Sequence, residues 1–199
     1  MTRRAIFIDR DGTLCEEVGY VNHVSRSRLL PNSAAAVRLA NQAGYPVIVA
    51  TNQAGVARGY FAESLIGQVH ASVREMLERE GAHVDAFYYC PHHPREGKSP
   101  YRNECDCRKP RPGMLLQAAR EHHIDLARSC MIGDSMADLG AASGAGVMPI
   151  HVLTGYGRGL VEHHGDRFTV RPAYTAEDLL DAVRWILDRD GPHKPTGDS

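Results

Sequence analysis

Short apolar runs alternate along the chain with longer stretches in which apolar residues recur at helical spacing. The short runs are rich in Ile, Val and Ala, and they predict five strands, at residues 5–8, 47–50, 84–88, 129–132 and 147–152. The longer stretches predict five helices, at about residues 32–41, 63–80, 112–122, 137–143 and 176–188. Strands that alternate with helices indicate an α/β protein, with a Rossmann-like parallel sheet covered by helices on both faces.

Two long segments interrupt this alternation. Residues 15–30 separate the first strand from its helix, and residues 89–111 separate the third strand from the next helix. Both follow the carboxyl ends of strands, where open α/β sheets bind ligands. Neither is large enough to form a second domain. We therefore expect one domain over residues 1–189, capless in the sense that no cap domain is inserted into it, and a disordered tail at 190–199. The Gly-rich stretch 155–159 lacks the context of a dinucleotide fingerprint and predicts a flexible loop.

Composition narrows the classes of function. The chain has 199 residues, of which 43% are hydrophobic and 24% charged, as in a soluble globular protein. Its net charge of −1 argues against a general nucleic-acid binder, which needs a basic surplus. No apolar run approaches the ~18 residues of a membrane span, and the run after the N-terminus is too short for a signal-peptide core. We therefore expect a cytoplasmic protein with a small-molecule partner and no membrane partner, and, since no hydrophobic surface stripe stands out, a monomer.

Two acidic residues follow the first predicted strand directly. Asp9 and Asp11 flank Arg10 and are followed by Gly12 and Thr13. Carboxylates this close repel each other unless a cation lies between them or one of them stays protonated. Both states suit catalysis, because Asp9 can act as a metal-bound nucleophile while Asp11 carries a proton.

Further polar groups follow the other predicted strands. The hydroxyl and amide groups of 51–53 can hold a phosphoryl oxygen, and Lys109 adds positive charge. Asp134 and Asp138 offer the carboxylate oxygens that Mg²⁺ prefers. Each of these residues also has an ordinary structural explanation, such as a helix cap or a solvated surface position. Their order, at the same end of successive strands, indicates a site for phosphoryl transfer.

The second long segment carries a set of metal-ligating residues. Cys90, His92, Cys105 and Cys107 supply three thiols and one imidazole, which match a closed tetrahedral zinc site. The alternative is four unrelated residues in one loop. Because the loop has little apolar content to pack, a structural Zn²⁺ would fix it, together with Arg108 and Lys109 beyond it. We expect the five cysteines to be thiols or metal ligands, not disulfides.

The chain resembles the haloacid dehalogenase superfamily of phosphohydrolases over nearly its whole length. The four motifs of that superfamily are matched in order by Asp9–Thr13, by Thr51, by Lys109, and by Gly133 and Asp134 with Asp138. The resemblance implies that Asp9 attacks phosphorus and that Asp11 protonates the leaving alcohol and then helps to deprotonate water. It also implies that Thr51 and Lys109 hold the phosphoryl group. Asp9, Asp134 and the main-chain carbonyl of Asp11 would hold Mg²⁺.

Within this superfamily, the zinc-loop residues resemble those of the heptose bisphosphate phosphatase family. The resemblance implies a sugar bisphosphate substrate, heptose 1,7-bisphosphate, which would lose its 7-phosphate in the synthesis of nucleotide-activated heptose. It also implies a pocket formed by four segments: Asp9, Arg10 and Asp11; Glu17, Val18, Gly19 and Tyr20; Thr51, Asn52, Gln53 and Ala54; Arg108 and Lys109.

Two alternatives remain at this point. The histidinol-phosphate phosphatases share the Cys-x-His and Cys-x-Cys pairs, although their spacer between the pairs is shorter than the one here. A non-catalytic zinc-loop module would use the acidic residues to hold Mg²⁺ for structure alone. The resemblance to the heptose family departs at Ser135, where many of its members have Lys, and it leaves the preference for one anomer open.

Overall fold

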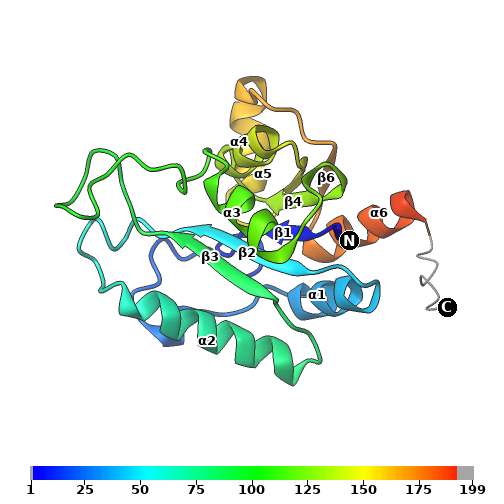
Figure 1. The fold of residues 1–199 in the computed structure, drawn as a ribbon, viewed down its shortest axis with the longest axis horizontal. Helices are drawn as coiled ribbons and strands as arrows, with labels where there is room; N and C mark the ends of the chain where they lie inside the picture. Colours follow the sequence, from blue (N-terminus) through cyan, green and yellow to red (C-terminus); the bar gives the residue numbers. More distant parts are fainter. Residues whose placement is uncertain (1, 192–199) are drawn as a thin grey trace.

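The computed structural model describes residues 2–191, which form one six-stranded parallel sheet flanked by helices (Figure 1). The strands are β1 (Ile6–Ile8), β2 (Val47–Asn52), β3 (Ala86–Cys90), β4 (Cys130–Gly133), β5 (Met148–Val152) and β6 (Tyr174–Ala176). The α-helices are α1 (Ser33–Gln42), α2 (Ser64–Arg79), α3 (Gly113–His122), α4 (Met136–Ala145), α5 (Gly157–His164) and α6 (Leu179–Asp190). Short 3₁₀ helices lie at Val24–Arg26, Leu126–Arg128 and Gly165–Arg167. The order of the strands in the sheet is β3-β2-β1-β4-β5-β6.

The strands alternate their side chains between two hydrophobic cores, one on each face of the sheet. Ile6 and Ile8 of β1 belong to the core that also contains the buried residues of α1, α2 and α6. Phe7, between them, belongs to the core that contains the buried residues of α3 and Ala142 of α4. This division follows from the two-residue period of a strand. Helices therefore cover both faces, as the apolar pattern predicts: α1 and α2 lie below the sheet in Figure 1, α6 packs against α1, and α3 and α4 lie above the sheet.

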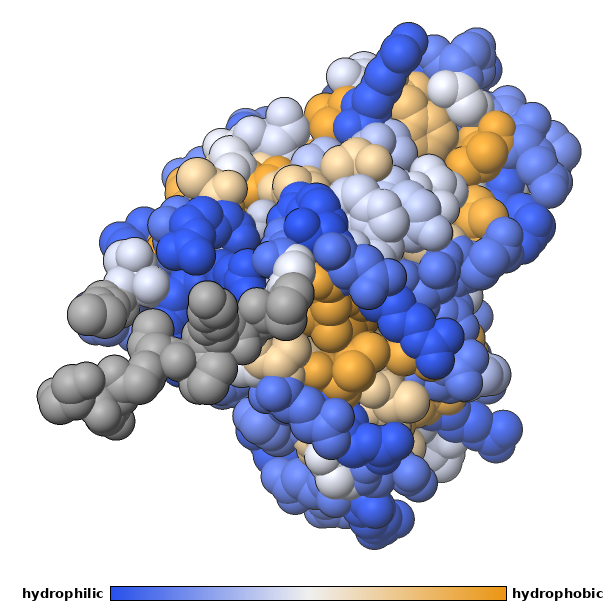
Figure 2. All heavy atoms as spheres, turned by 90° about the vertical axis from the view of Figure 1, so that its right-hand side faces the viewer, coloured by the Kyte–Doolittle hydropathy of each residue, from blue (hydrophilic) through white to orange (hydrophobic). Residues whose placement is uncertain are grey.

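Outside these cores the surface is mainly polar. Figure 2 shows the side of the molecule at the right of Figure 1, where hydrophilic side chains cover most of the face and hydrophobic ones appear in patches between them. No helix within residues 2–191 is both long enough and apolar enough to cross a bilayer.

The structure corrects the sequence prediction in the last third of the chain. The Gly-rich stretch 155–159 is not a flexible loop: Gly157 begins α5, and the short strand β6 follows at the edge of the sheet. Residue 190, which we expected to begin a disordered tail, belongs instead to a helix. Asp190 is the last residue of α6, and its carboxylate accepts hydrogen bonds from Arg4 Nη1 (2.9 Å) and Tyr45 Oη (2.5 Å). The rest of that tail, residues 192–199, lies outside the described residues.

The parallel sheet brings the carboxyl ends of β1, β2 and β4 together, because these strands are adjacent. The backbone N–H of Asp9 donates to Ile132 O (2.9 Å), so the first residue after β1 lies beside the end of β4. Strand β2 runs two residues further than expected, to Asn52, and β3 runs to Cys90. The first motif, the second motif and the zinc loop therefore start from neighbouring positions on one edge of the sheet.

Candidate active site

A buried lysine links two acidic residues at this edge. Lys109 Nζ lies 2.8 Å from Asp9 Oδ1 and 2.5 Å from Asp138 Oδ1, and it also donates to Ala50 O (2.7 Å). The Lys109 side chain is 2% exposed and that of Asp138 is fully buried, whereas Asp9 is 13% exposed. Burial opposes the charge on Lys109, but the carboxylates of Asp138 and Asp9 together raise its pKa above the ordinary value. Lys109 is thus a fixed cation between the two acids, and Asp9 is the more solvent-exposed of them.

The same cluster carries an excess of negative charge that a divalent cation would neutralise. Carboxylate oxygens of Asp9, Asp134 and Asp138 all lie within 4.8 Å of one another. Burial, Asp138 and Asp134 raise the pKa of Asp9 well above its usual value, although Lys109 acts against them. Burial and Asp138 raise the pKa of Asp134 to about 7. Three acids beside one lysine therefore fit a site for Mg²⁺, which prefers carboxylate oxygens.

The three acids differ in how much of each carboxylate is already engaged. Asp138 Oδ1 pairs with Lys109, and its Oδ2 accepts from the backbone N–H (3.0 Å) and the hydroxyl (2.5 Å) of Ser135 as the capping box of α4. Asp134 Oδ2 accepts from the backbone N–H of Tyr156 (2.8 Å). Asp138 therefore positions Lys109 and α4, and among the described residues Asp9 and Asp134 are better placed to bind a metal.

Asp11 is held by donors from two segments. Arg10 Nε and Nη2 donate to the two oxygens of Asp11 (3.0 and 2.8 Å), and Gln53 Nε2 donates to Asp11 Oδ2 (2.8 Å). Gln53 Nε2 also donates to Thr51 Oγ1 (2.9 Å). The second motif is thus connected directly to the second acid of the first motif.

A cavity of about 150 Å³ opens above these groups. It is lined by Asp9, Asp11, Glu17, Gly19, Thr51, Asn52, Lys109, Asp134, Ser135 and Tyr156. Eight of these ten are site residues expected from the sequence. Ser135, where many members of the heptose family have Lys, also lies on the wall of this cavity.

Other residues expected in the pocket lie behind or beside it. The Arg10 and Gln53 side chains are buried, and Ala54 is 8% exposed. Tyr20 is 38% exposed and packs edge-on against Tyr60, with 4.7 Å between ring centroids. Val18 packs against the core through its partly buried side chain, and its carbonyl accepts from Arg26 Nη2 (3.0 Å).

Arg108 faces the zinc loop. Its Nη1 donates to His92 O (3.2 Å), and the residue lines a cavity of about 250 Å³ together with Cys105 and Lys109. This arrangement joins the metal-ligating loop to the residue that precedes the buried lysine.

The segment after β5 is a part of the site that the sequence prediction missed. Thr154 Oγ1 donates to Gly12 O (2.6 Å), and the backbone N–H of Tyr156 donates to Asp134. At Gly155, with φ of +56°, an added Cβ would lie 2.1 Å from Asp134 Oδ2, so only glycine fits there. Tyr156 and Glu17 both line the pocket, where burial and the Glu17 carboxylate raise the pKa of the Tyr156 hydroxyl. The only available signal was the position of these residues directly after a predicted strand.

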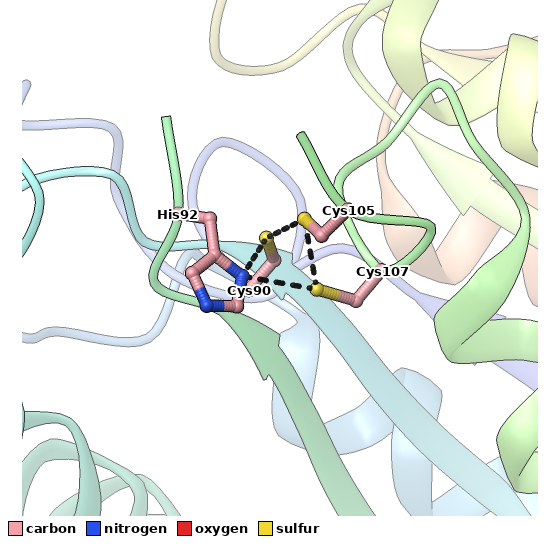
Figure 3. Close-up of side chains that lie close together, drawn as sticks. All are labelled: Cys90, His92, Cys105 and Cys107. Carbon is pink, nitrogen blue, oxygen red and sulfur yellow. Dashed lines mark hydrogen bonds between the residues drawn. The ribbon is translucent and has the colours of Figure 1, made fainter. Parts of the chain in front are cut away.

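The four zinc-ligand candidates converge, as Figure 3 shows. Cys90 Sγ lies 3.4 Å from Cys105 Sγ and 3.7 Å from His92 Nδ1, while Cys107 Sγ lies 3.2 Å from Cys105 Sγ and 3.5 Å from His92 Nδ1. These separations are too long for a disulfide, whose sulfurs lie about 2.05 Å apart. They are close to the edges of a tetrahedron around Zn²⁺ with Zn–S bonds of about 2.3 Å, so this donor set fits zinc.

Within this cluster the thiols are electrostatically unequal. Hydrogen bonds from Cys90, Cys105 and His92 lower the pKa of Cys107 to about 5, although burial acts against them. The hydrogen bond to Cys107 and burial together raise the pKa of Cys90. Cys107 is therefore the thiol of the cluster that ionises most easily, and the thiolate is the form of cysteine that binds metals.

The tip of the zinc loop packs on the segment that follows β2. Arg58 forms an ion pair with Glu96, and Gly97 lies so close to Ala57 that an added Cβ would be 1.9 Å from the carbonyl oxygen of Ala57. The tip of the loop is thus fixed against the segment that continues from the second motif.

Comparisons with known proteins agree with this geometry. Residues 106–182 match the model of a family described as HAD-hydrolase-like. The chain is 41% identical to D-glycero-D-manno-heptose-1,7-bisphosphate 7-phosphatase of Thermosynechococcus vestitus, over 96% of this chain and 100% of that protein. It is 42% identical to D-glycero-beta-D-manno-heptose-1,7-bisphosphate 7-phosphatase of Haemophilus influenzae, over 80% of this chain and 90% of that protein.

A solved structure is similar over almost the same length. It is D,D-heptose 1,7-bisphosphate phosphatase from B. bronchiseptica complexed with magnesium and phosphate, with a TM-score of 0.83 and 34% identity, covering 94% of this chain and 99% of that chain. The relatives are named phosphatases, that is, phosphoric monoester hydrolases. The haloacid dehalogenase resemblance is therefore confirmed: the chain belongs to the HAD-like hydrolases, within the family of D-glycero-D-manno-heptose-1,7-bisphosphate 7-phosphatases.

Proposed function

We propose that this protein removes the 7-phosphate of D-glycero-D-manno-heptose 1,7-bisphosphate through an aspartyl-phosphate intermediate on Asp9. The observation that carries the proposal is the position of Asp9. It lies on the wall of the pocket, 2.8 Å from the Lys109 ammonium and close to two further carboxylates, in a chain 41% identical to a named heptose bisphosphatase over 96% of its residues. A nucleophile beside fixed positive charge suits phosphoryl transfer, which depends mainly on positioning and charge neutralisation.

In the first step an oxygen of Asp9 attacks phosphorus, and the bond from phosphorus to the sugar oxygen breaks. Asp11 gives its proton to that oxygen, so the products of the step are the free alcohol, an Asp11 carboxylate and phosphorylated Asp9. Thr51 and Lys109 hold the phosphoryl oxygens. Both residues line the cavity with Asp9 and Asp11, which supports these roles.

In the second step water attacks the phosphorus of the intermediate. Asp11 takes a proton from that water, the bond between phosphorus and the Asp9 oxygen breaks, and phosphate leaves. Both carboxyl groups then have their starting protonation states, so the cycle balances without a further reactant.

Two metals complete the proposal. Asp9, Asp134 and the main-chain carbonyl of Asp11 would hold Mg²⁺, which supplies positive charge next to the transferring phosphoryl group. Cys90, His92, Cys105 and Cys107 would hold a structural Zn²⁺ that fixes the loop leading to Lys109. The unbalanced charge of the acidic cluster supports the first site, and the converging donor set supports the second.

The proposal also includes the assembly and the compartment. We propose a monomer, because no hydrophobic surface stripe stands out in the sequence. None of the five cysteines forms a disulfide, which supports a reducing compartment such as the cytoplasm.

A phosphate-release assay over a panel of substrates tests the function. The panel contains heptose 1,7-bisphosphate as both anomers, monophosphates of common sugars, and histidinol phosphate, each with and without Mg²⁺. We expect the highest kcat/KM with the heptose bisphosphate, and release only when Mg²⁺ is present. Faster turnover of histidinol phosphate would replace the proposal with the alternative substrate, and absence of release from every substrate would reject catalysis.

A further inference from the structure

Three N–H groups fix the carboxylate of Asp11. Two come from the fork of Arg10 and one from Gln53, with donor–acceptor distances of 2.8 to 3.0 Å. An arginine fork that meets both carboxylate oxygens fixes the plane of the group as well as its position. Gln53 shares the same amide nitrogen with Thr51 Oγ1, so the direction of Asp11 is set relative to the expected phosphoryl-binding hydroxyl.

Arg10 and Gln53 are themselves withdrawn from the pocket. The Arg10 side chain is 1% exposed, against 18% for Asp11, and Gln53 is 6% exposed. Neither residue is on the cavity wall, whereas Asp11 and Thr51 are. A side chain enclosed in this way does not reach a bound substrate, although the chain positions of both residues suggested direct binding.

The surroundings of Arg10 also favour Asp11 as its partner. His70 is buried, and its ring stacks on Phe87 with 4.6 Å between ring centroids. Burial, with the nearby Arg10 charge as the next cause, lowers the pKa of His70 to about 3, so this ring is neutral. Asp11 is the carboxylate that pairs with Arg10 among residues 2–191.

We propose that Arg10 and Gln53 are positioning residues that act on the reaction through Asp11, by aiming its carboxyl group at the leaving oxygen of the substrate. The inference rests on the proposed function, in which Asp11 gives a proton to that oxygen. A leaving group whose anion is strongly basic needs this proton in the transition state, whereas a leaving group whose anion is weakly basic does not. If Asp11 points in the wrong direction, hydrolysis of substrates with a strongly basic leaving group is therefore slowed more than hydrolysis of the others.

Two aryl phosphates of similar size separate this role from substrate binding. Phenyl phosphate releases a basic phenolate, and 4-nitrophenyl phosphate releases a much weaker base. We expect Arg10→Met and Gln53→Met each to lower kcat/KM for phenyl phosphate about tenfold more than for 4-nitrophenyl phosphate. We expect inhibition by inorganic phosphate to be unchanged, and Arg10→Lys to recover part of the loss. Equal losses with both substrates, or weaker inhibition by phosphate, would overturn the proposal.

A double-mutant cycle tests whether the effect passes through Asp11. In an Asp11→Asn background, Arg10→Met should cause no further loss of kcat/KM for phenyl phosphate, whereas independent roles would multiply the two losses. Arg74→Met is the matched control, because Arg74 donates to Val84 O (3.2 Å) away from the pocket. We expect this control to leave the ratio of the two substrates unchanged.

Protein folding and basal function are checked separately. If Arg10→Met does not fold, as judged by its thermal unfolding, Gln53→Met decides the question alone. The proposed function fails if the wild-type protein hydrolyses neither aryl phosphate nor any sugar phosphate. The positioning role fails if the wild-type protein is active and the variants lose both aryl phosphates equally.

Discussion

Asn52 and Lys109 are joined by a pair of hydrogen bonds, although 57 residues separate them in the chain. Asn52 Oδ1 accepts from the Lys109 backbone N–H (3.0 Å), and Asn52 Nδ2 donates to Lys109 O (3.0 Å). The side chain of the last residue of β2 thus binds the backbone of Lys109 much as a neighbouring strand would. The ammonium group of Lys109 can then reach back into the acidic cluster.

Replacement of Asn52 tests the importance of this pairing for catalysis. In Asn52→Ala both bonds to the Lys109 backbone are lost, so we expect kcat to fall about 10- to 100-fold, since small displacements of charged groups are costly in active sites. The free energy of unfolding should fall by about 1–3 kcal/mol. Steady-state kinetics and urea denaturation measure the two effects.

Asn41→Ala is the matched control for that variant. Asn41 Oδ1 accepts from the backbone N–H of His83 (2.9 Å), a long-range bond of the same kind far from the pocket. We expect this control to lower stability and leave kcat unchanged. An equal loss of kcat in both variants would show that the Asn52 pairing acts only through stability.

The raised pKa of Asp134 predicts how stability depends on pH before Mg²⁺ is added. Burial raises this pKa to about 7 in the folded state, above about 3.9 for an unfolded chain. Between these values the folded protein binds more protons than the unfolded one, so stability falls as the pH rises from about 4 to 7. Magnesium-free protein should therefore have a lower Tm at pH 8 than at pH 5.5. Added Mg²⁺ should raise Tm most at pH 8, where Asp134 is ionised.

Asp134→Asn isolates the contribution of this one group. The variant should show a shallower fall of Tm between pH 5.5 and 8, and a smaller increase of Tm with Mg²⁺. Differential scanning calorimetry at several pH values gives both numbers. A slope identical to that of the wild-type protein would mean that Asp134 is not the group that titrates.

The zinc loop should control both metal content and the position of Lys109. In Cys107→Ser the cluster loses the thiol that is already most easily ionised, so we expect loss of Zn²⁺, measured by atomic emission. Loss of a structural metal should lower stability by on the order of 3 kcal/mol. Proteolytic cleavage within residues 91–106 should become faster.

His93→Ala is the comparison for the zinc experiment. His93 is next to His92 in the chain, but its Nδ1 accepts from the backbone N–H of Glu96 (3.0 Å) and it is not part of the cluster. This variant should keep its Zn²⁺. Full zinc content in Cys107→Ser would contradict the assignment of the site.

The sheet could be predicted from the sequence because its central strands are buried on both faces. Runs such as Val47–Ala50 are apolar without interruption, and this pattern is distinctive. By contrast, β6 has three residues at the sheet edge, one of them exposed, and α5 begins with two glycines in its first three residues. Neither has a strong local pattern, so tertiary packing decides their structure.

The location of the site could be predicted from the sequence where its motifs directly follow predicted strands. The positions of Asp9 and Asp134 at one edge follow from the parallel topology, whereas Lys109 ends a long loop and is held there by Asn52. What the motifs do not specify is the direction of a side chain, and Arg10, expected to bind substrate, points instead at Asp11. Nor do they reveal that Tyr156, after a different strand, donates its backbone N–H to Asp134.

Covalent capture of the phosphoryl group on Asp9 tests the central claim most directly. Asp11→Asn should still accept the phosphoryl group from 4-nitrophenyl phosphate in the presence of Mg²⁺, because that leaving group needs no proton, but it should release it slowly. Rapid acid quenching, reduction with borohydride and peptide mass spectrometry should then find Asp9 converted to homoserine. An unmodified Asp9 in protein that has released one equivalent of 4-nitrophenol, or modification at another residue, would contradict the mechanism.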